Sequence, residues 1–212
     1  MLLTKEKCSD VLDILERVYP DAKPELNFET PFTLLVAVIL SAQCTDKRVN
    51  EVTSVLFKKY DKPEDFVKMT QEELESYIKP CGFYHDKARH IIGAAQKICS
   101  DYGGNVPDKF EELLKLPGVG RKTANVVYAV AFGGDAIAVD THVFRVSHRL
   151  NMSDAKDPEG TEKQLYELIA DGRRNRAHHL LIFHGRRCCK AQRPLCSDCP
   201  VKDYCRFGGN NE

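Results

Sequence analysis

The segment from Phe110 to Phe132 most constrains the fold, because two runs with helical apolar spacing meet there at a very short turn. The turn is Pro117-Gly118-Val119-Gly120, which is too short and too rich in glycine for anything except a tight connection between helices. Glycine also leaves the backbone amides uncovered. We therefore predict a helical hairpin in which the amides of Gly118, Gly120 and the first turn of the second helix form an anion site, suited to a nucleic-acid phosphate.

Two cations, Arg121 and Lys122, follow this turn directly. Cations in the first turn of a helix oppose the helix dipole, so a residue placed there against the local preference is a candidate functional residue. The positive end of a helix disfavours an ammonium and so favours the neutral amine of Lys122, which can act as a nucleophile. The alternative is that both side chains are solvated and hold a phosphate.

The composition limits where such chemistry could take place. The chain has 212 residues, a formal net charge of +0 and a pI of about 7.0, so a nucleic-acid surface must come from local clustering of charge. Acids and bases interrupt the apolar pattern of the first residues, which argues against a secretory signal. The longest apolar run, Phe32 to Leu40, is too short to span a bilayer. We expect a reducing, cytoplasmic setting, in which clustered cysteines bind metal rather than form disulfides.

The apolar spacing predicts helices throughout and no strand, so the expected class is all-α. We predict helices over 4–19 and 32–41, a helix capped by Thr45 or Asp46, and a capping box at Thr70 with Glu73. Pro80-Cys81-Gly82-Phe83-Tyr84 predicts a second tight turn, and Gly133-Gly134 should end the helix that follows the hairpin.

Asp140 precedes the apolar pattern of a further helix and stands where an N-cap belongs. Two interpretations stay open from position alone. Asp140 could serve only as a cap, or it could direct a carboxylate from a helix start into a cleft.

The stretch from Arg173 to Pro194 contains no acid. In a chain with no net charge this bias predicts a phosphate-contacting surface, with a solvated basic face as the alternative. Its cations are Arg173, Arg174, Arg176, Arg186, Arg187, Lys190 and Arg193.

Four cysteines near the end of the chain have the spacing C-x6-C-x2-C-x5-C. Four thiolates so close in sequence can form one tetrahedral site, for zinc or for an iron–sulfur cluster, and the basic surroundings favour the negatively charged cluster. The predicted ligands are Cys189, Cys196, Cys199 and Cys205, with Cys188 as a spare thiol. The remaining cysteines are expected to be small core residues, namely Cys8, Cys44, Cys81 and Cys99.

Several motifs follow one another along the chain, namely LSAQCTD at 40–46, GFYHDKA at 82–88, LPGVGRKTANVV at 116–127, VDTHVFRV at 139–146 and the cysteine tail. Together they resemble the endonuclease III family of helix–hairpin–helix DNA glycosylases, over essentially the whole chain. The resemblance implies two helical domains flanking a DNA groove. One would be a six-helix domain at 24–134, and the other would join 1–23 to 135–212 and carry a [4Fe-4S] cluster in its loop at 189–205.

The same resemblance implies a bifunctional DNA N-glycosylase and AP lyase, acting in base excision repair on double-stranded DNA with a damaged pyrimidine or an abasic site. It would excise oxidised pyrimidines and nick the abasic site by β-elimination, as a nucleoid-associated monomer in the cytoplasm. Lys122 would be the nucleophile and Asp140 would stabilise positive charge on the sugar. Contacts with DNA would come from Gln43 in the space of the flipped base, Phe83 as an apolar wedge, and Gly118, Gly120, Lys190 and Arg193 at phosphates.

Competing interpretations stay open at this point. A sister glycosylase of the same fold could act on mismatched thymine or adenine, a non-catalytic DNA-binding protein could use the hairpin and a metal module alone, and the tail could bind zinc. Without the family, Gln43 would be a polar residue at a helix end and Phe83 a core aromatic.

Overall fold

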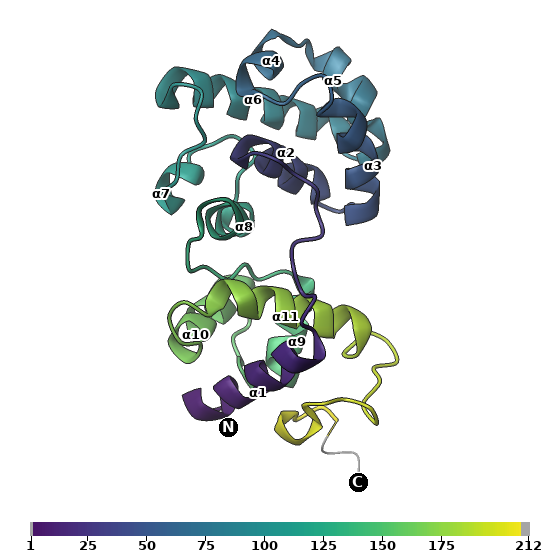
Figure 1. Ribbon diagram of the computed structural model, residues 1–212, viewed down its shortest axis with the longest axis vertical. Coiled ribbons are helices and arrows are strands. Elements are labelled where there is room, and N and C mark those ends of the chain that lie inside the picture. Colours follow the sequence, from purple (N-terminus) through teal and green to yellow (C-terminus); the bar gives the residue numbers. More distant parts are fainter. Residues whose placement is uncertain (1, 209–212) are drawn as a thin grey trace. The chain divides into compact units, whose positions relative to one another are not determined.

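The computed structural model describes residues 2–208, and no strand occurs among them (Figure 1). The all-α prediction is therefore confirmed for the described chain. The helices are α1 (Lys5–Val18), α2 (Pro31–Ser41), α3 (Asp46–Leu56), α4 (Pro63–Lys68), α5 (Gln71–Ile78), α6 (Tyr84–Tyr102), α7 (Phe110–Leu113), α8 (Arg121–Phe132), α9 (Thr141–Arg149), α10 (Pro158–Leu168) and α11 (Arg174–Arg187). Short 3-10 turns lie at η1 (Lys79–Cys81) and η2 (Lys202–Tyr204).

Side-chain caps and glycines set many helix ends, as the sequence predicts. Thr45 accepts a hydrogen bond from the amide of Arg48 at 3.3 Å and so begins α3. Thr70 caps α5 in the same way, through the amide of Glu73 at 3.1 Å. The predicted capping box is only half formed, because the carboxylate of Glu73 accepts a hydrogen bond from the hydroxyl of Tyr60 at 2.8 Å. Gly133, in the left-handed region at φ +68°, ends α8.

The described chain divides into two compact units. One is continuous, Pro24–Gly134, and the other joins the chain before Pro24 to the chain from Asp135 onward. That these units are the two domains implied by the resemblance stays a prediction.

Each unit has its own apolar core. In the Pro24–Gly134 unit, α2 is buried nearly all round and contacts α3, α6 and α8, while α6 also carries α4 and α5 (Figure 1). In the other unit, α11 packs against α9 and α1. None of the described helices combines the length and the apolar character needed to cross a membrane.

Candidate nucleic-acid interface

The predicted hairpin lies between α7 and α8, although α7 ends earlier than the apolar pattern suggests, at Leu113. Gly118 has φ +74°, and a Cβ atom there would lie 2.6 Å from the Cβ of His90 on α6. The turn itself therefore requires this glycine. Gly120 differs, because its backbone is extended (φ −87°, ψ 177°) and a Cβ would meet nothing within 4 Å. The fold does not require a glycine at 120, although glycine is among the residues favoured as an N-cap, and the open space at its Cβ position leaves room for close approach by a ligand.

The start of α8 presents bare amides and two cations. Gly120 is its N-cap, no side chain caps it, and its first turn contains no acid. Arg121 lies with its guanidinium 5.3 Å from the ring centre of Phe110, so it fastens α8 to α7. Lys122 is exposed. Of the two misplaced cations, one thus has a structural partner and the other projects into solvent.

Gln43 and Phe83 occupy two exposed tips with unusual backbone geometry. Gln43 has φ +54° just beyond α2, and Phe83 has φ +48° at the N-cap of α6. Non-glycine residues in this region cost roughly 1–2 kcal/mol each. Phe83 is 64% exposed, so the alternative that it is a core aromatic is wrong. Strain at an exposed apolar tip is typical of a functional site.

Asp140 caps α9, as its position predicts. Its Oδ1 accepts a hydrogen bond from the amide of Val143 at 2.7 Å. The capping role uses one carboxylate oxygen and does not exclude a second role for the other. His142, two residues later, lies with Nδ1 3.1 Å from Nη2 of Arg145, which gives this histidine a structural partner.

All of the predicted cluster cysteines line one small pocket near the end of the described chain. Apolar side chains, including Leu150, Leu195 and Phe207, form much of the rest of its wall. Cys188 lines the pocket too, and its sulfur lies within 4.8 Å of ligand atoms of His184 and Cys199. The pocket is lined by Cys188, Cys189, Cys196, Cys199 and Cys205, and none of them forms a disulfide.

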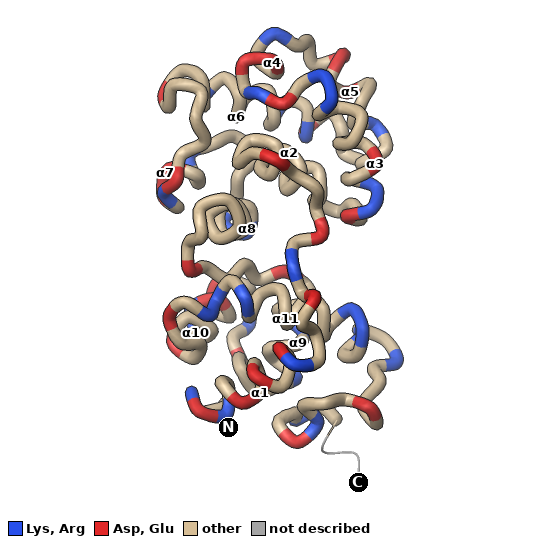
Figure 2. Tube along the Cα trace, in the orientation of Figure 1, with Lys and Arg blue, Asp and Glu red and all other residues tan. Residues whose placement is uncertain are grey.

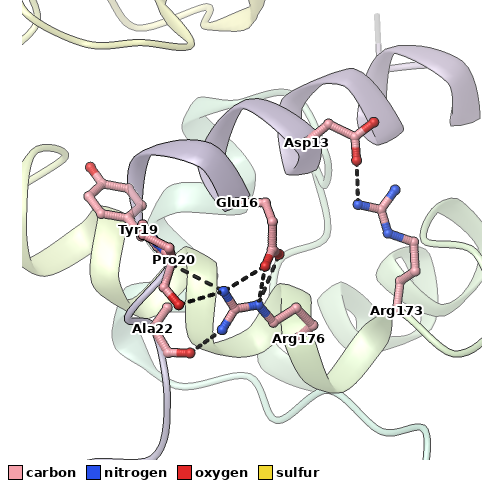
Figure 3. Close-up of polar contacts among 7 residues, drawn as sticks. All are labelled: Asp13, Glu16, Tyr19, Pro20, Ala22, Arg173 and Arg176. Carbon is pink, nitrogen blue, oxygen red and sulfur yellow. Dashed lines mark hydrogen bonds and ion pairs between the residues drawn. The ribbon is translucent and has the colours of Figure 1, made fainter.

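The interpretation of the acid-free stretch as a phosphate surface is wrong for most of its arginines. Arg176 binds both carboxylate oxygens of Glu16 at 2.9 Å, and Arg173 binds Asp13 at 2.6 Å (Figure 3). Acids outside the stretch neutralise these cations, and Figure 2 shows both signs of charge interspersed in each unit. The same holds for Arg174 with Asp135 and for Arg187 with Asp21. Lys190 and Arg193, in the loop that follows, are exposed.

Comparison with known proteins decides the family. Residues 36–171 match the family described as HhH-GPD superfamily base excision DNA repair protein, and residues 189–205 match the iron–sulfur binding domain of endonuclease III. Endonuclease III of Bacillus subtilis is 50% identical over 208 residues, which cover 98% of this chain and 95% of that relative. The chain belongs to the endonuclease III family.

Further relatives agree with this assignment. Endonuclease III of Escherichia coli K12 is 40% identical over 205 residues, 97% of each chain. A solved non-covalent endonuclease III–DNA complex matches with a TM-score of 0.93 and 48% identity, covering 98% of both chains. A thermostable thymine-DNA glycosylase has a TM-score of 0.87 at 24% identity, which shows the shared fold alone.

As a member of the endonuclease III family, this chain is a DNA glycosylase of base excision repair with AP lyase activity, and its partner is DNA. These predictions are confirmed. The comparisons favour this function over a sister thymine-mismatch or adenine glycosylase and over a non-catalytic DNA-binding metal protein.

The endonuclease III family also carries a [4Fe-4S] cluster, so the predicted cofactor is confirmed. The residues present fit it, because thiols gathered in one largely apolar pocket are the donors that iron–sulfur clusters take. Arg149 donates from Nη1 to the sulfur of Cys189 at 3.4 Å and to the carbonyl of Lys190 at 2.8 Å. Positive charge beside a cluster offsets its negative charge.

Sequence reasoning missed three positioning side chains in this member of the endonuclease III family. Arg145 and Arg149, on α9, hold the backbone of the cysteine loop through the carbonyls of Cys189 and Lys190. Lys87, on α6, is buried and donates to carbonyls at the base of both exposed tips. No local signal marks these three, since each contact joins residues of separate elements.

Proposed function

We propose that this enzyme excises oxidised pyrimidines and then cleaves the abasic site by β-elimination, with Lys122 as nucleophile and Asp140 as its charged partner. The exposed amine of Lys122 at an uncapped helix start carries the proposal. Lys122 is a nucleophile in the first turn of α8, and the amides of that turn can bind phosphates of the same DNA strand.

The reaction begins once the damaged nucleotide leaves the base stack, at a cost of roughly a few kcal/mol that is smallest for a damaged base. Gln43 fills the space that the base vacates, and Phe83 enters the stack as a wedge. The amides at Gly118 and Gly120, together with Lys190 and Arg193, hold the phosphates.

The neutral amine of Lys122 then attacks C1′. The nitrogen–C1′ bond forms as the glycosidic bond breaks, and the base departs with that electron pair and takes up a proton. Loss of the amine proton and opening of the sugar ring give a Schiff base. The carboxylate of Asp140 stabilises the positive charge that develops on the sugar and helps to deprotonate Lys122.

The Schiff base acidifies the proton on C2′. Removal of that proton expels the 3′ phosphate, which breaks the strand, and hydrolysis of the imine returns Lys122.

The cluster would be held by Cys189, Cys196, Cys199 and Cys205. Its iron–thiolate bonds would tie the end of the chain together. We place the protein in the cytoplasm, associated with the nucleoid.

Borohydride trapping on a duplex with one abasic site tests this mechanism. Reduction of the Schiff base gives a covalent protein–DNA adduct, which we expect with the wild type and not with Lys122→Gln. Lys115→Gln is the matched control, because it removes an exposed amine from the same hairpin and should leave the adduct in place. An adduct that persists in Lys122→Gln would overturn the assignment. Base release and strand nicking, measured separately on duplexes with different oxidised pyrimidines, define the substrate range.

A further inference from the structure

One buried ammonium connects the two exposed tips. Lys87 is only 5% exposed, and its Nζ donates to three backbone carbonyls: Leu40 at 2.9 Å, Ala42 at 2.8 Å and Cys81 at 2.9 Å. An ammonium has three N–H donors and no acceptor, so this arrangement satisfies it fully. All of these residues belong to the Pro24–Gly134 unit.

The three carbonyls lie at the base of the tips. Leu40 lies in the last turn of α2, and Ala42 is its C-cap, directly before Gln43. Cys81 ends η1, two residues before Phe83. Carbonyls at the end of a helix lack partners within the helix and carry its negative end, which a cation stabilises. Lys87 therefore fixes two segments that lie about forty residues apart in sequence.

Two cysteines also contribute to the surroundings of Lys87. The thiols of Cys44 and Cys81 lie nearby, and burial, followed by the neighbouring Cys44, raises the pKa of Cys81 to about 11. Cys81 therefore stays a neutral thiol near pH 7. Burial lowers the pKa of Lys87, while the two thiols act in the opposite direction. Carbonyl dipoles, rather than a paired acid, thus hold this ammonium in place.

The strain at the tips explains why such a tie is needed. Gln43 and Phe83 are exposed and both have positive φ, a geometry that persists only where the surrounding structure enforces it. We propose that Lys87 is a positioning residue for opening the duplex: it holds the turns of Gln43 and Phe83 at a fixed separation, so that both side chains enter the base stack together. This inference rests on the DNA-opening roles given to those two residues in the proposed function.

The test compares Lys87→Met with two further variants. Lys87→Gln keeps two N–H donors at this position. Lys97→Met removes an ammonium from the exposed face of the same helix, where Lys97 pairs with Asp101, and it is the matched control. Each protein is assayed for cleavage of one abasic site, once in a duplex and once in a single strand, because a single strand needs no opening of a base stack. The fluorescence of 2-aminopurine beside the lesion reports the opening itself.

We expect Lys87→Met to cleave the duplex about tenfold to hundredfold more slowly, with a weaker 2-aminopurine signal. Side chains displaced by about 1 Å from their working positions can slow a reaction by this factor. Its cleavage of the single strand should stay within about twofold of the wild type. Lys87→Gln should show a smaller loss on the duplex, and Lys97→Met none. If Lys87→Met does not fold, Lys87→Gln is judged by the same difference between substrates.

Two results would overturn the inference. One is undiminished duplex cleavage in Lys87→Met, and the other is an equal loss on both substrates, which would make Lys87 a purely structural residue. Failure of the proposed function looks different, because the borohydride adduct would then be missing from the wild type or would persist in Lys122→Gln. In that case the 2-aminopurine signal still decides whether Lys87 governs opening of the stack.

Discussion

At the scale of single residues, Asp140 combines a helix cap with a charge, and a substitution can separate the two. Asp140→Asn keeps an oxygen that accepts from the amide of Val143 but removes the negative charge. We expect its unfolding midpoint in urea to stay close to the wild type, while base excision in single turnover slows by about 100-fold or more.

Asp140→Ala serves as the comparison, because it loses the cap as well. It should lose about 1 kcal/mol of folding stability in addition to the rate. Full activity in Asp140→Asn would leave this residue with its cap alone.

The two hairpin glycines should respond differently to alanine. Gly118→Ala places a Cβ against His90 at positive φ, so we expect it to lose about 1–2 kcal/mol or more of folding stability. Gly120→Ala meets open space in an extended backbone and should stay within about 0.5 kcal/mol of the wild type. Its affinity for an abasic duplex, measured by fluorescence anisotropy, should nevertheless fall, because the methyl group blocks a phosphate. Unchanged affinity would remove Gly120 from the interface.

At the scale of elements, arginines of α11 tie this helix to α1. Arg176 joins Glu16 to the carbonyls of Tyr19 and Ala22 at the end of α1, so one guanidinium fixes both the side and the end of that helix (Figure 3). Arg173 adds a second link through Ser9 and Asp13. These two arginines of α11 thus stabilise the packing of α11 against α1.

This pairing predicts a pH dependence of folding. The hydrogen bond from Arg176 lowers the pKa of Glu16 below its usual 4.5. A carboxyl group with a depressed pKa contributes stability above its unfolded value, and this contribution is lost as pH falls below about 4.5. The carboxylate is 44% exposed, so solvent screening limits the effect to about 1 kcal/mol or less.

Urea unfolding between about pH 3 and about pH 6, a range that begins below the usual carboxyl pKa values and ends well above them, measures this dependence. Glu16→Gln should be less stable than the wild type at the upper end, and the difference should shrink at the lower end. Asp10→Asn, at an exposed position on the same helix, is the control, and its folding stability should match that of the wild type at both ends of the pH range. A constant difference across the range would show that Glu16 does not act through its charge.

At the scale of the whole molecule, the described residues form two separate cores, and the cysteine pocket belongs to one of the two units. Loss of the cluster should therefore weaken that unit selectively. We expect Cys189→Ser to lose its iron and its visible absorption, and to lose amide hydrogen-exchange protection in α9 and α11 while α2 and α6 keep theirs.

Cys188→Ser is the matched control, since it removes the adjacent thiol of the same pocket and should retain iron. Iron retained in Cys189→Ser and lost in Cys188→Ser would shift the ligand assignment by one residue. Loss of protection in both units together would contradict their independence.

Much of this fold could be predicted from the sequence, because the interactions that form its helices and turns join residues only a few positions apart. Apolar spacing, caps at Thr45, Thr70 and Asp140, and the glycine turn after α7 all operate within about one helical turn, so the all-α class and the hairpin follow from local patterns. The predicted cluster cysteines likewise lie close together in the sequence. The motifs, taken together and in their order along the chain, identify the family.

Packing between distant elements decided the rest. Arg176 meets Glu16 from 160 positions away, and Lys87 meets Ala42 from 45 positions away. Such contacts depend on which helix faces which, and no local pattern encodes that choice. The acidic partners of the arginines between Arg173 and Pro194 therefore could not be predicted from the sequence. The exposed tips at Gln43 and Phe83, with their positive φ, are likewise visible only in the folded chain.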